Sequence, residues 1–260
     1  MKTIRAGIIQ FDVKLGDVDS NLKRAKQHIR RLANQGVKMI VLPEMWSTGF
    51  ANKELDRLAE TTPDILGEIS LLAKETNTII IGSLPEKVEK KIFNTAYLVD
   101  ERGAISATYQ KIHLFSLTGE DQWFNGGRKG VVCSTSVGPV GLLICYDLRF
   151  PELCRSLTLK GAKIVVVMAQ WPDSRAAHWK TLLAARAIEN QVFVLAANRC
   201  GQDHDLVYAG HSRIISPCGE VLARAGKKGT SITADIDFKL LDRFRKTIPC
   251  LRERVPEAYG

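Results

Sequence analysis

Short apolar runs alternate with segments of helical periodicity along this chain, and that alternation restricts the fold more than any other feature. Residues 4–11, 39–42 and 78–81 are apolar runs of strand length. Two segments with apolar residues at helical spacing lie between them, one ending before Gly36 and one following Pro63. The opening third therefore predicts the order strand, helix, strand, helix, strand, which is typical of α/β proteins.

The middle of the chain adds antiparallel pairing, because residues 93–99 and 104–109 flank a hairpin turn at residues 100–103. Further strands are expected at residues 140–144, 164–168 and 192–197, helices at 151–160 and 176–190, and a last hairpin at 212–215 and 220–223. With 260 residues, 45% of them hydrophobic, and no linker or repeat, one domain over residues 1–260 is expected. The pattern predicts an α/β fold of two mixed sheets packed face to face with helices outside.

Composition narrows the partners and the compartment. The formal charge is +9, but acidic residues stand between the basic ones, so we expect a solvated surface and no nucleic-acid site. The longest wholly apolar runs, residues 164–169 and 192–197, are far shorter than the ~20 residues that cross a bilayer, and neither a membrane span nor a secretory signal is expected. The six cysteines form no C-x-x-C pair, which favours reduced thiols and a cytoplasmic location.

Three chemically capable side chains follow three of the expected strands. Glu44 comes after residues 39–42, Lys111 after 104–109 and Cys145 after 140–144. Taken singly, each is more often solvated or packed than catalytic. Together they form a sufficient set, because a thiol with a pKa near ~8.5 needs a base to become a nucleophile and the resulting oxyanion needs a fixed positive charge.

The residues around these three positions resemble a known family. Leu-Pro-Glu at 42–44, Lys-Ile-His-Leu-Phe at 111–115 and Cys-Tyr-Asp-Leu-Arg-Phe-Pro-Glu at 145–152 are similar to the three signatures of the nitrilase superfamily of carbon-nitrogen hydrolases, in the family's order. The resemblance covers essentially the whole chain and implies an α-β-β-α sandwich. It also implies a triad of Glu44, Lys111 and Cys145 with a further glutamate, which best matches Glu120, although the adjacent Asp121 is an alternative.

The implied reaction needs no metal and no organic cofactor. Glu44 would take the thiol proton, Cys145 would attack an amide carbon, and Lys111 with the backbone N–H of Tyr146 would hold the oxyanion. Glu120 would orient its neighbours rather than exchange protons. The chain is therefore expected to be an enzyme that forms a cysteine thioester.

The substrate prediction also rests on resemblance. Residues 145–152 are similar to the omega-amidase and deaminated-glutathione amidase branches, and residues 169–179 with 196–199 resemble bacterial omega-amidases that act on 2-oxoglutaramate and 2-oxosuccinamate. We therefore expect hydrolysis of the terminal carboxamide of a small dicarboxylic acid monoamide to carboxylate and ammonia. A deaminated-glutathione-type amidase, a nitrilase acting on another small amide or nitrile, and a non-enzymatic scaffold remain as alternatives.

Several residues are candidates for binding that substrate. Arg175 follows the strand next to that of the nucleophile and could clamp a remote carboxylate, unless it pairs with Asp173. Arg199 and Tyr208 are rival contacts. The expected aromatic walls of the pocket are Phe50, Trp123 and Trp171. Asp147 and Arg149, beside the nucleophile, are expected to form an architectural ion pair or hydrogen-bond network.

The end of the chain points to self-association. Residues 248–260 carry Pro249, Leu251, Val255, Pro256 and Tyr259 after the last expected helix. Such a tail could cover a neighbouring subunit, and the family resemblance implies a homodimer. A strap folded over its own domain is the alternative.

Overall fold

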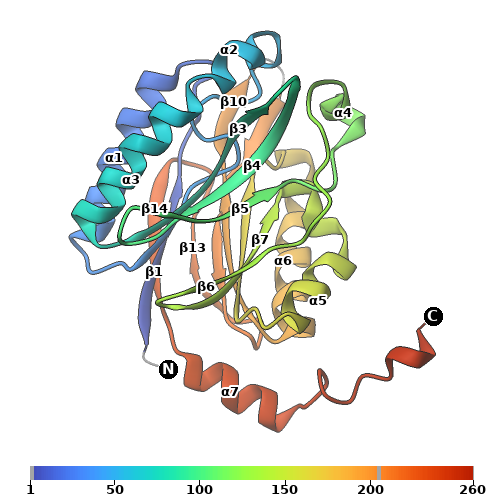
Figure 1. Ribbon diagram of the computed structural model, residues 1–260. Coiled ribbons are helices and arrows are strands. Elements are labelled where there is room, and N and C mark those ends of the chain that lie inside the picture. Colours follow the sequence, from blue (N-terminus) through green and yellow to red (C-terminus); the bar gives the residue numbers. More distant parts are fainter. Residues whose placement is uncertain (1–2, 204–205, 260) are drawn as a thin grey trace.

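Two six-stranded sheets lie face to face with helices on both outer sides, as Figure 1 shows for the computed structural model, which describes residues 3–203 and 206–259. The strand order is β14-β1-β2-β3-β4-β5 in one sheet and β13-β12-β9-β8-β7-β6 in the other. Both sheets contain parallel and antiparallel pairs. The predicted fold class, two mixed sheets with helices outside, is confirmed.

The first sheet carries most of the opening third of the chain. Its strands are β1 (Ile4–Gln10), β2 (Met39–Val41), β3 (Ile79–Val88), β4 (Lys91–Val99), β5 (Ile105–Gln110) and β14 (Thr230–Ile236). Helices α1 (Val18–Ala33) and α3 (Thr62–Thr76) cover its outer face (Figure 1). The predicted order of alternating strands and helices is confirmed here, with one short added helix, α2 (Leu55–Ala59).

The second sheet provides the other half of the sandwich. Its strands are β6 (Val132–Thr135), β7 (Gly138–Ile144), β8 (Ile164–Ala169), β9 (Phe193–Asn198), β12 (Arg213–Ile215) and β13 (Val221–Arg224). Helices α5 (Pro151–Leu159) and α6 (Ala176–Asn190) pack outside it (Figure 1). The helices and the last hairpin lie within about two residues of their expected positions.

The central strands are buried on both faces, which explains their nearly continuous apolar sequences. Successive strand side chains point to opposite faces. Ile8 and Val41 therefore join the core between the sheets, whereas Ile9 and Ile40 join the layer beneath α1 and α3. All four are completely buried. Because parallel strands covered on both sides need apolar residues at every position, the runs lack the polar alternation of a solvated sheet.

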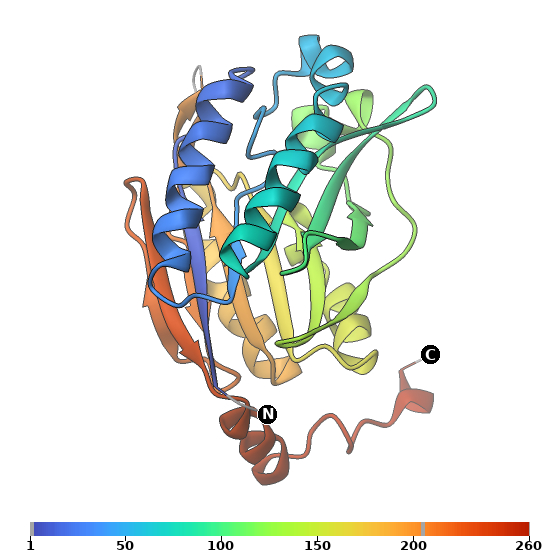
Figure 2. The ribbon, with the colours of Figure 1, turned by 60° about the vertical axis from the view of Figure 1, so that its left-hand side comes forward.

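A small hairpin and a C-terminal segment complete the chain. The hairpin pairs β10 (Cys200–Asp203) with β11 (Leu206–Ala209). Helix α7 (Phe238–Thr247) follows β14, and the segment after it runs away from the sandwich in both Figure 1 and Figure 2. Its side chains at Ile248, Val255 and Tyr259 are 49%, 46% and 67% exposed, so the described tail is not a strap over its own sandwich.

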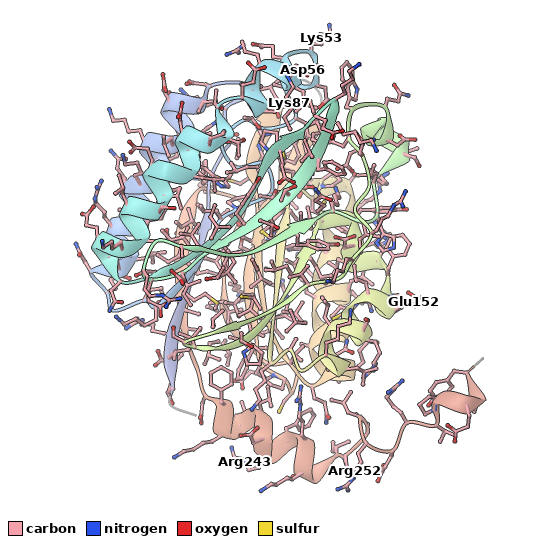
Figure 3. All side chains as sticks on the ribbon, in the orientation of Figure 1. Lys53, Asp56, Lys87, Glu152, Arg243 and Arg252 are labelled. Atoms are coloured by element: carbon pink, nitrogen blue, oxygen red, sulfur yellow. The ribbon has the colours of Figure 1, made fainter. Side chains whose placement is uncertain are left out.

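Charged side chains are distributed around the outside of the molecule. Figure 3 labels Lys53, Asp56 and Lys87 at one end and Arg243 and Arg252 at the opposite end. Some of the basic groups have an acidic neighbour. The Lys87 Nζ, for example, lies 3.4 Å from Asp56 Oδ1. Among the described residues, no helix combines the length and apolar character required to span a membrane.

Candidate active site

The three side chains singled out in the sequence follow strands of both sheets. Glu44 lies three residues beyond β2, and Lys111 directly follows β5 in the same sheet. Cys145 directly follows β7 of the opposite sheet and opens a short 3₁₀ turn, Cys145–Arg149. Its φ of 46° lies in the left-handed region, which an L-residue adopts only when the surrounding structure imposes it. All three line one cavity.

The Lys111 ammonium is held between two carboxylates. Its Nζ donates to Glu44 Oε1 at 2.8 Å and to both oxygens of Glu120, at 2.7 and 2.9 Å. Lys111 and Glu120 are 1% and 4% exposed, and Glu44 is completely buried. Asp121, the alternative to Glu120, is exposed to solvent. The structure thus brings Glu120, and not Asp121, to the lysine.

Backbone and amide groups fix the Glu44 carboxylate as well. Asn94 Nδ2 donates to Oε1 at 2.8 Å, and the backbone N–H of Gln170 donates to Oε2 at 2.9 Å. The Gln170 side chain also donates to the Glu44 carbonyl at 2.9 Å. Sequence reasoning missed both residues. The available clue to Asn94 was a polar side chain within the mostly apolar strand β4, where burial requires a hydrogen-bond partner.

Burial and charge displace the pKa values of these groups. Burial raises the pKa of Glu44, and Lys111 opposes the rise. Burial also raises the pKa of the Cys145 thiol well above its usual range, with Glu44 adding to the rise and Lys111 opposing it. Burial alone would lower the pKa of Lys111, but Glu44 and Glu120 outweigh it and raise that pKa. These shifts favour the protonated form of the thiol and the charged form of the ammonium, and they make the Glu44 carboxylate more basic than usual.

The cavity beside this cluster is small, and aromatic side chains form part of its wall. Its volume is about 150 Å³, below the ~300–1,000 Å³ of sites for drug-sized ligands, so its ligand is a small molecule. Its aromatic lining residues are Phe50, Phe115, Tyr146, Trp171 and Tyr208. The expected positions of Phe50 and Trp171 agree with this lining.

Trp123 corrects one expectation, because it is 43% exposed and is not among the described residues that line the cavity. Trp123 is the last residue of the short helix α4 (Glu120–Trp123). The next residue, Phe124, has extended backbone and is 3% exposed. Phe124 packs edge-on against Phe50, with the ring centroids 6.0 Å apart. The buried aromatic on this loop is therefore Phe124.

Two arginines line the cavity. Arg175 does not pair with Asp173, which instead binds Lys227 at 2.9 Å, and no carboxylate within residues 3–203 and 206–259 forms an ion pair with Arg175. Its guanidinium lies 5.5 Å from the centroid of the Phe115 ring. Arg149 was expected to form an ion pair or a hydrogen-bond network with Asp147, and no such contact joins the two side chains among the described residues.

The Arg149 guanidinium turns away from Asp147 toward the cavity. It lies 4.6 Å from the centroid of the Trp171 ring and 3.3 Å from His178 Nδ1. Asp147 faces other donors, because it is buried on the opposite side of the turn. The cavity therefore holds a second guanidinium that sequence reasoning had assigned to the architecture.

Arg199, a rival contact for the substrate, is occupied by the protein itself. Its buried guanidinium binds Asp203 and donates to Asp12 at 3.3 Å and to Gln170 Oε1 at 3.0 Å. It also lies 4.2 Å from the centroid of the Tyr208 ring. Arg199 thus ties the β10–β11 hairpin to the body, while Tyr208 remains on the cavity wall.

Comparisons with known proteins identify the family of the chain. A family model described as carbon-nitrogen hydrolase matches residues 5–246. The 2-oxoglutaramate amidase of Bacillus subtilis (strain 168) is 38% identical over 253 residues, which are 96% of this chain and 97% of that protein. The omega-amidase NIT2 of Homo sapiens is 34% identical over 271 residues, covering 100% of this chain and 98% of that protein.

A solved structure adds a chemical observation. A mutant of the amidase from Nesterenkonia sp. AN1 is 26% identical, covers 98% of this chain and 95% of its own, and superposes with a TM-score of 0.89. That protein carries the acetamide moiety of fluoroacetamide covalently on its active-site cysteine. A cysteine mechanism is consistent with the site described above. The chain therefore belongs to the carbon-nitrogen hydrolases of the nitrilase superfamily and is a hydrolase of linear amides.

Proposed function

We propose that the protein is an omega-amidase, which cleaves the terminal carboxamide of a small dicarboxylic acid monoamide of the 2-oxoglutaramate or 2-oxosuccinamate type. The observation that carries this proposal is the buried Lys111 ammonium, shared by Glu44 and Glu120 in the cavity that Cys145 lines. The relatives named as 2-oxoglutaramate amidase and omega-amidase support the substrate class. The small volume of the cavity suits a substrate of this size.

Acylation begins with proton transfer inside the cavity. Glu44 takes the proton of the Cys145 thiol, and the sulfur attacks the amide carbon. The Lys111 ammonium and the backbone N–H of Tyr146 stabilise the resulting oxyanion. Glu44 returns its proton to the amide nitrogen, the carbon–nitrogen bond breaks, and ammonia leaves a thioester on Cys145. The raised pKa of Glu44 favours the first step, since a stronger base removes the thiol proton more readily.

Deacylation uses the same groups. Glu44 removes a proton from a water molecule that attacks the thioester carbon, the oxyanion again faces Lys111, and the thiol leaves with the proton from Glu44. Glu120 holds the ammonium in place by two hydrogen bonds, and its Oε2 accepts a third from the backbone N–H of Phe115. Glu120 therefore positions Lys111 without exchanging protons.

Arg175 is the proposed anchor for the substrate carboxylate. It lines the cavity, carries a positive charge and has no carboxylate partner among the described residues. A guanidinium that binds a carboxylate fixes the distance between that anion and the reacting carbon, which gives specificity as well as affinity. Arg149 is the competing anchor, because its guanidinium also lines the cavity.

Ammonia release from a substrate panel tests this function. We expect kcat/KM for 2-oxoglutaramate to exceed that of an uncharged amide of equal length by on the order of 10²-fold, since charge-assisted hydrogen bonds contribute roughly 1.5–3 kcal/mol each. Arg175→Ala should remove most of this preference, and Arg224→Ala, an exposed arginine of β13, should leave it unchanged. Equal kcat/KM for charged and neutral amides would refute anion recognition. A preference that survives Arg175→Ala would move the recognition to another residue, and Arg149 and Tyr208 are the candidates that line the cavity.

A homodimer is also proposed, and its support is the C-terminal tail. Gln191 donates to the Ile248 carbonyl at 2.7 Å at the base of this segment, but the apolar side chains beyond it are exposed. A second copy would cover them. We expect the mass measured by light scattering at micromolar concentration to be twice that of the chain, and removal of residues 249–260 to shift the protein toward monomer. A monomeric mass for the whole chain would contradict the proposal.

A further inference from the structure

Asp147 occupies a junction between the two proposed catalytic segments. Its side chain is completely buried, and each of its two carboxylate oxygens accepts two hydrogen bonds. Oδ1 faces the backbone N–H of His113 at 3.1 Å and His113 Nδ1 at 2.8 Å. Oδ2 accepts from the Tyr109 hydroxyl at 2.7 Å and the backbone N–H of Ile144 at 2.9 Å. These four contacts satisfy the hydrogen-bonding capacity of the buried carboxylate.

The partners of Asp147 flank the two proposed catalytic residues in the sequence. Tyr109 and His113 stand on either side of Lys111, whereas Ile144 and Asp147 stand on either side of Cys145. Lys111 belongs to a segment of the first sheet and Cys145 to a segment of the second. We propose that Asp147 is a positioning residue, whose carboxylate fixes the separation and orientation of Cys145 relative to Lys111. This inference rests on the catalytic roles proposed above for those two residues.

The backbone at the nucleophile explains why such a clamp is needed. The left-handed φ of Cys145 is strained, and strain of this kind persists only where neighbouring contacts enforce it. Asp147 supplies one of those contacts, because its Oδ2 holds the Ile144 N–H that immediately precedes the strained residue. Without the clamp, we expect the turn to relax and the sulfur to move relative to the ammonium.

The side chains around the carboxylate are themselves held in place. Burial, followed by the charge of Asp147, raises the pKa of Tyr109, so its hydroxyl stays protonated. The Tyr109 oxygen in turn accepts from the Ile112 N–H at 3.3 Å. The His113 ring stacks on Phe150, with centroids 3.6 Å apart and planes 7° apart, and this fixes its orientation. Four donors therefore face a single acceptor group.

Asp147→Asn tests the clamp. The substitution replaces one carboxylate oxygen with an NH2 group, which cannot accept the two hydrogen bonds that this oxygen now accepts. Asp100→Asn is the matched control. Asp100 is also buried and accepts several hydrogen bonds, including those from the backbone of Arg102 and Ala104, but in the β4–β5 turn outside the cavity. Both variants are expected to lose thermal stability. Only Asp147→Asn should lower kcat, by on the order of 10²-fold as for a small misplacement of reacting groups, with KM changed less than about threefold.

A second readout follows the sulfur itself. Peptide-resolved mass spectrometry can measure the rate of Cys145 alkylation by 2-chloroacetamide, with the exposed Cys218 as an internal reference. The rate at Cys145 relative to Cys218 should fall at least about tenfold in Asp147→Asn and stay unchanged in Asp100→Asn. Equal kcat and alkylation rates in Asp147→Asn and wild type would overturn the proposal.

Milder variants keep the test valid if Asp147→Asn does not fold. His113→Asn retains a side-chain N–H donor near the position of Nδ1, and His113→Leu removes it. We expect the asparagine variant to keep most of kcat and the leucine variant to lose it, with Tyr109→Phe also lowering kcat. Equal kcat in both His113 variants together with an unchanged Tyr109→Phe would refute the clamp. If wild-type Cys145 itself is not acylated during turnover, the proposed function fails instead.

Discussion

Cys145→Ala is expected to abolish amide hydrolysis, with kcat reduced on the order of 10⁵-fold or more, as for removal of a nucleophile that acts with its base as one unit. Cys145 is the one cysteine, among the described residues, that lines the cavity containing Glu44 and Lys111. The side chains of the other five lie elsewhere in the molecule, buried in three cases and exposed in two. Mass spectrometry of acid-quenched wild-type enzyme should find the acyl adduct on Cys145 alone.

Two further variants distinguish loss of the nucleophile from other causes of lost activity. Glu44→Gln keeps the shape of the side chain but removes the base, and we expect it to be nearly as inactive as Cys145→Ala. Cys218→Ala changes an exposed thiol at the turn between β12 and β13 and should retain full activity. An acyl group on Cys133, Cys154 or Cys200, or turnover by Cys145→Ala, would disprove the assignment of the nucleophile.

The predictable parts of this molecule are those that local pattern determines. Strands such as residues 140–144 are apolar at every position because they are buried on both faces, and their ends are recognisable from the change in composition. Glu44, Lys111 and Cys145 all stand at such ends. For this reason the sequence could single out each of them, while their grouping into one site rested on their complementary chemistry and on the family resemblance.

Contacts between distant segments were not predictable in the same way. Strand β14 is rich in Thr and Ser, and it becomes a strand by pairing with β1, where Ile236 lies opposite Ile4. The choice between Glu120 and Asp121 likewise depends on how the short helix α4 is oriented toward Lys111. The sequence does not show which of two neighbouring carboxylates faces the lysine. An ion pair or hydrogen-bond network of Arg149 with Asp147 was expected because both stand close to the nucleophile in the sequence, but Arg149 contacts His178 and the Trp171 ring instead.

Lys111→Arg should lower kcat by on the order of 10²- to 10³-fold, the usual cost of losing one oxyanion donor. The ammonium is a compact charge, whereas a guanidinium is planar and larger. The cavity offers Lys111 no room to lengthen, because its Nζ already lies within 2.9 Å of oxygens of two carboxylates. Arginine would keep the charge but displace it from the oxyanion. Ammonia release at saturating substrate measures this loss.

A matched control lies on the surface. Lys87 also stands between two carboxylates, with Nζ 3.4 Å from Asp56 and 3.0 Å from Glu60, but it is partly exposed and does not line the cavity. Lys87→Arg should leave both kcat and stability unchanged, because exposed ion pairs contribute little. A comparable loss of kcat in Lys87→Arg would mean that the effect of Lys111→Arg is not specific to the site.

Lys111→Met separates the lysine's part in stability from its part in catalysis. It leaves Glu44 and Glu120 buried without a cation, which should lower the free energy of unfolding by about 3–5 kcal/mol, the usual cost of breaking a buried pair on one side. Adding Glu120→Gln removes one of the two carboxylates and should restore part of that stability, as denaturant unfolding would show. It should not restore kcat, because the positive charge at the oxyanion is still missing. Recovery of turnover along with stability in the double variant, or more than about a tenth of wild-type kcat in Lys111→Arg, would show that the lysine serves the architecture rather than the reaction.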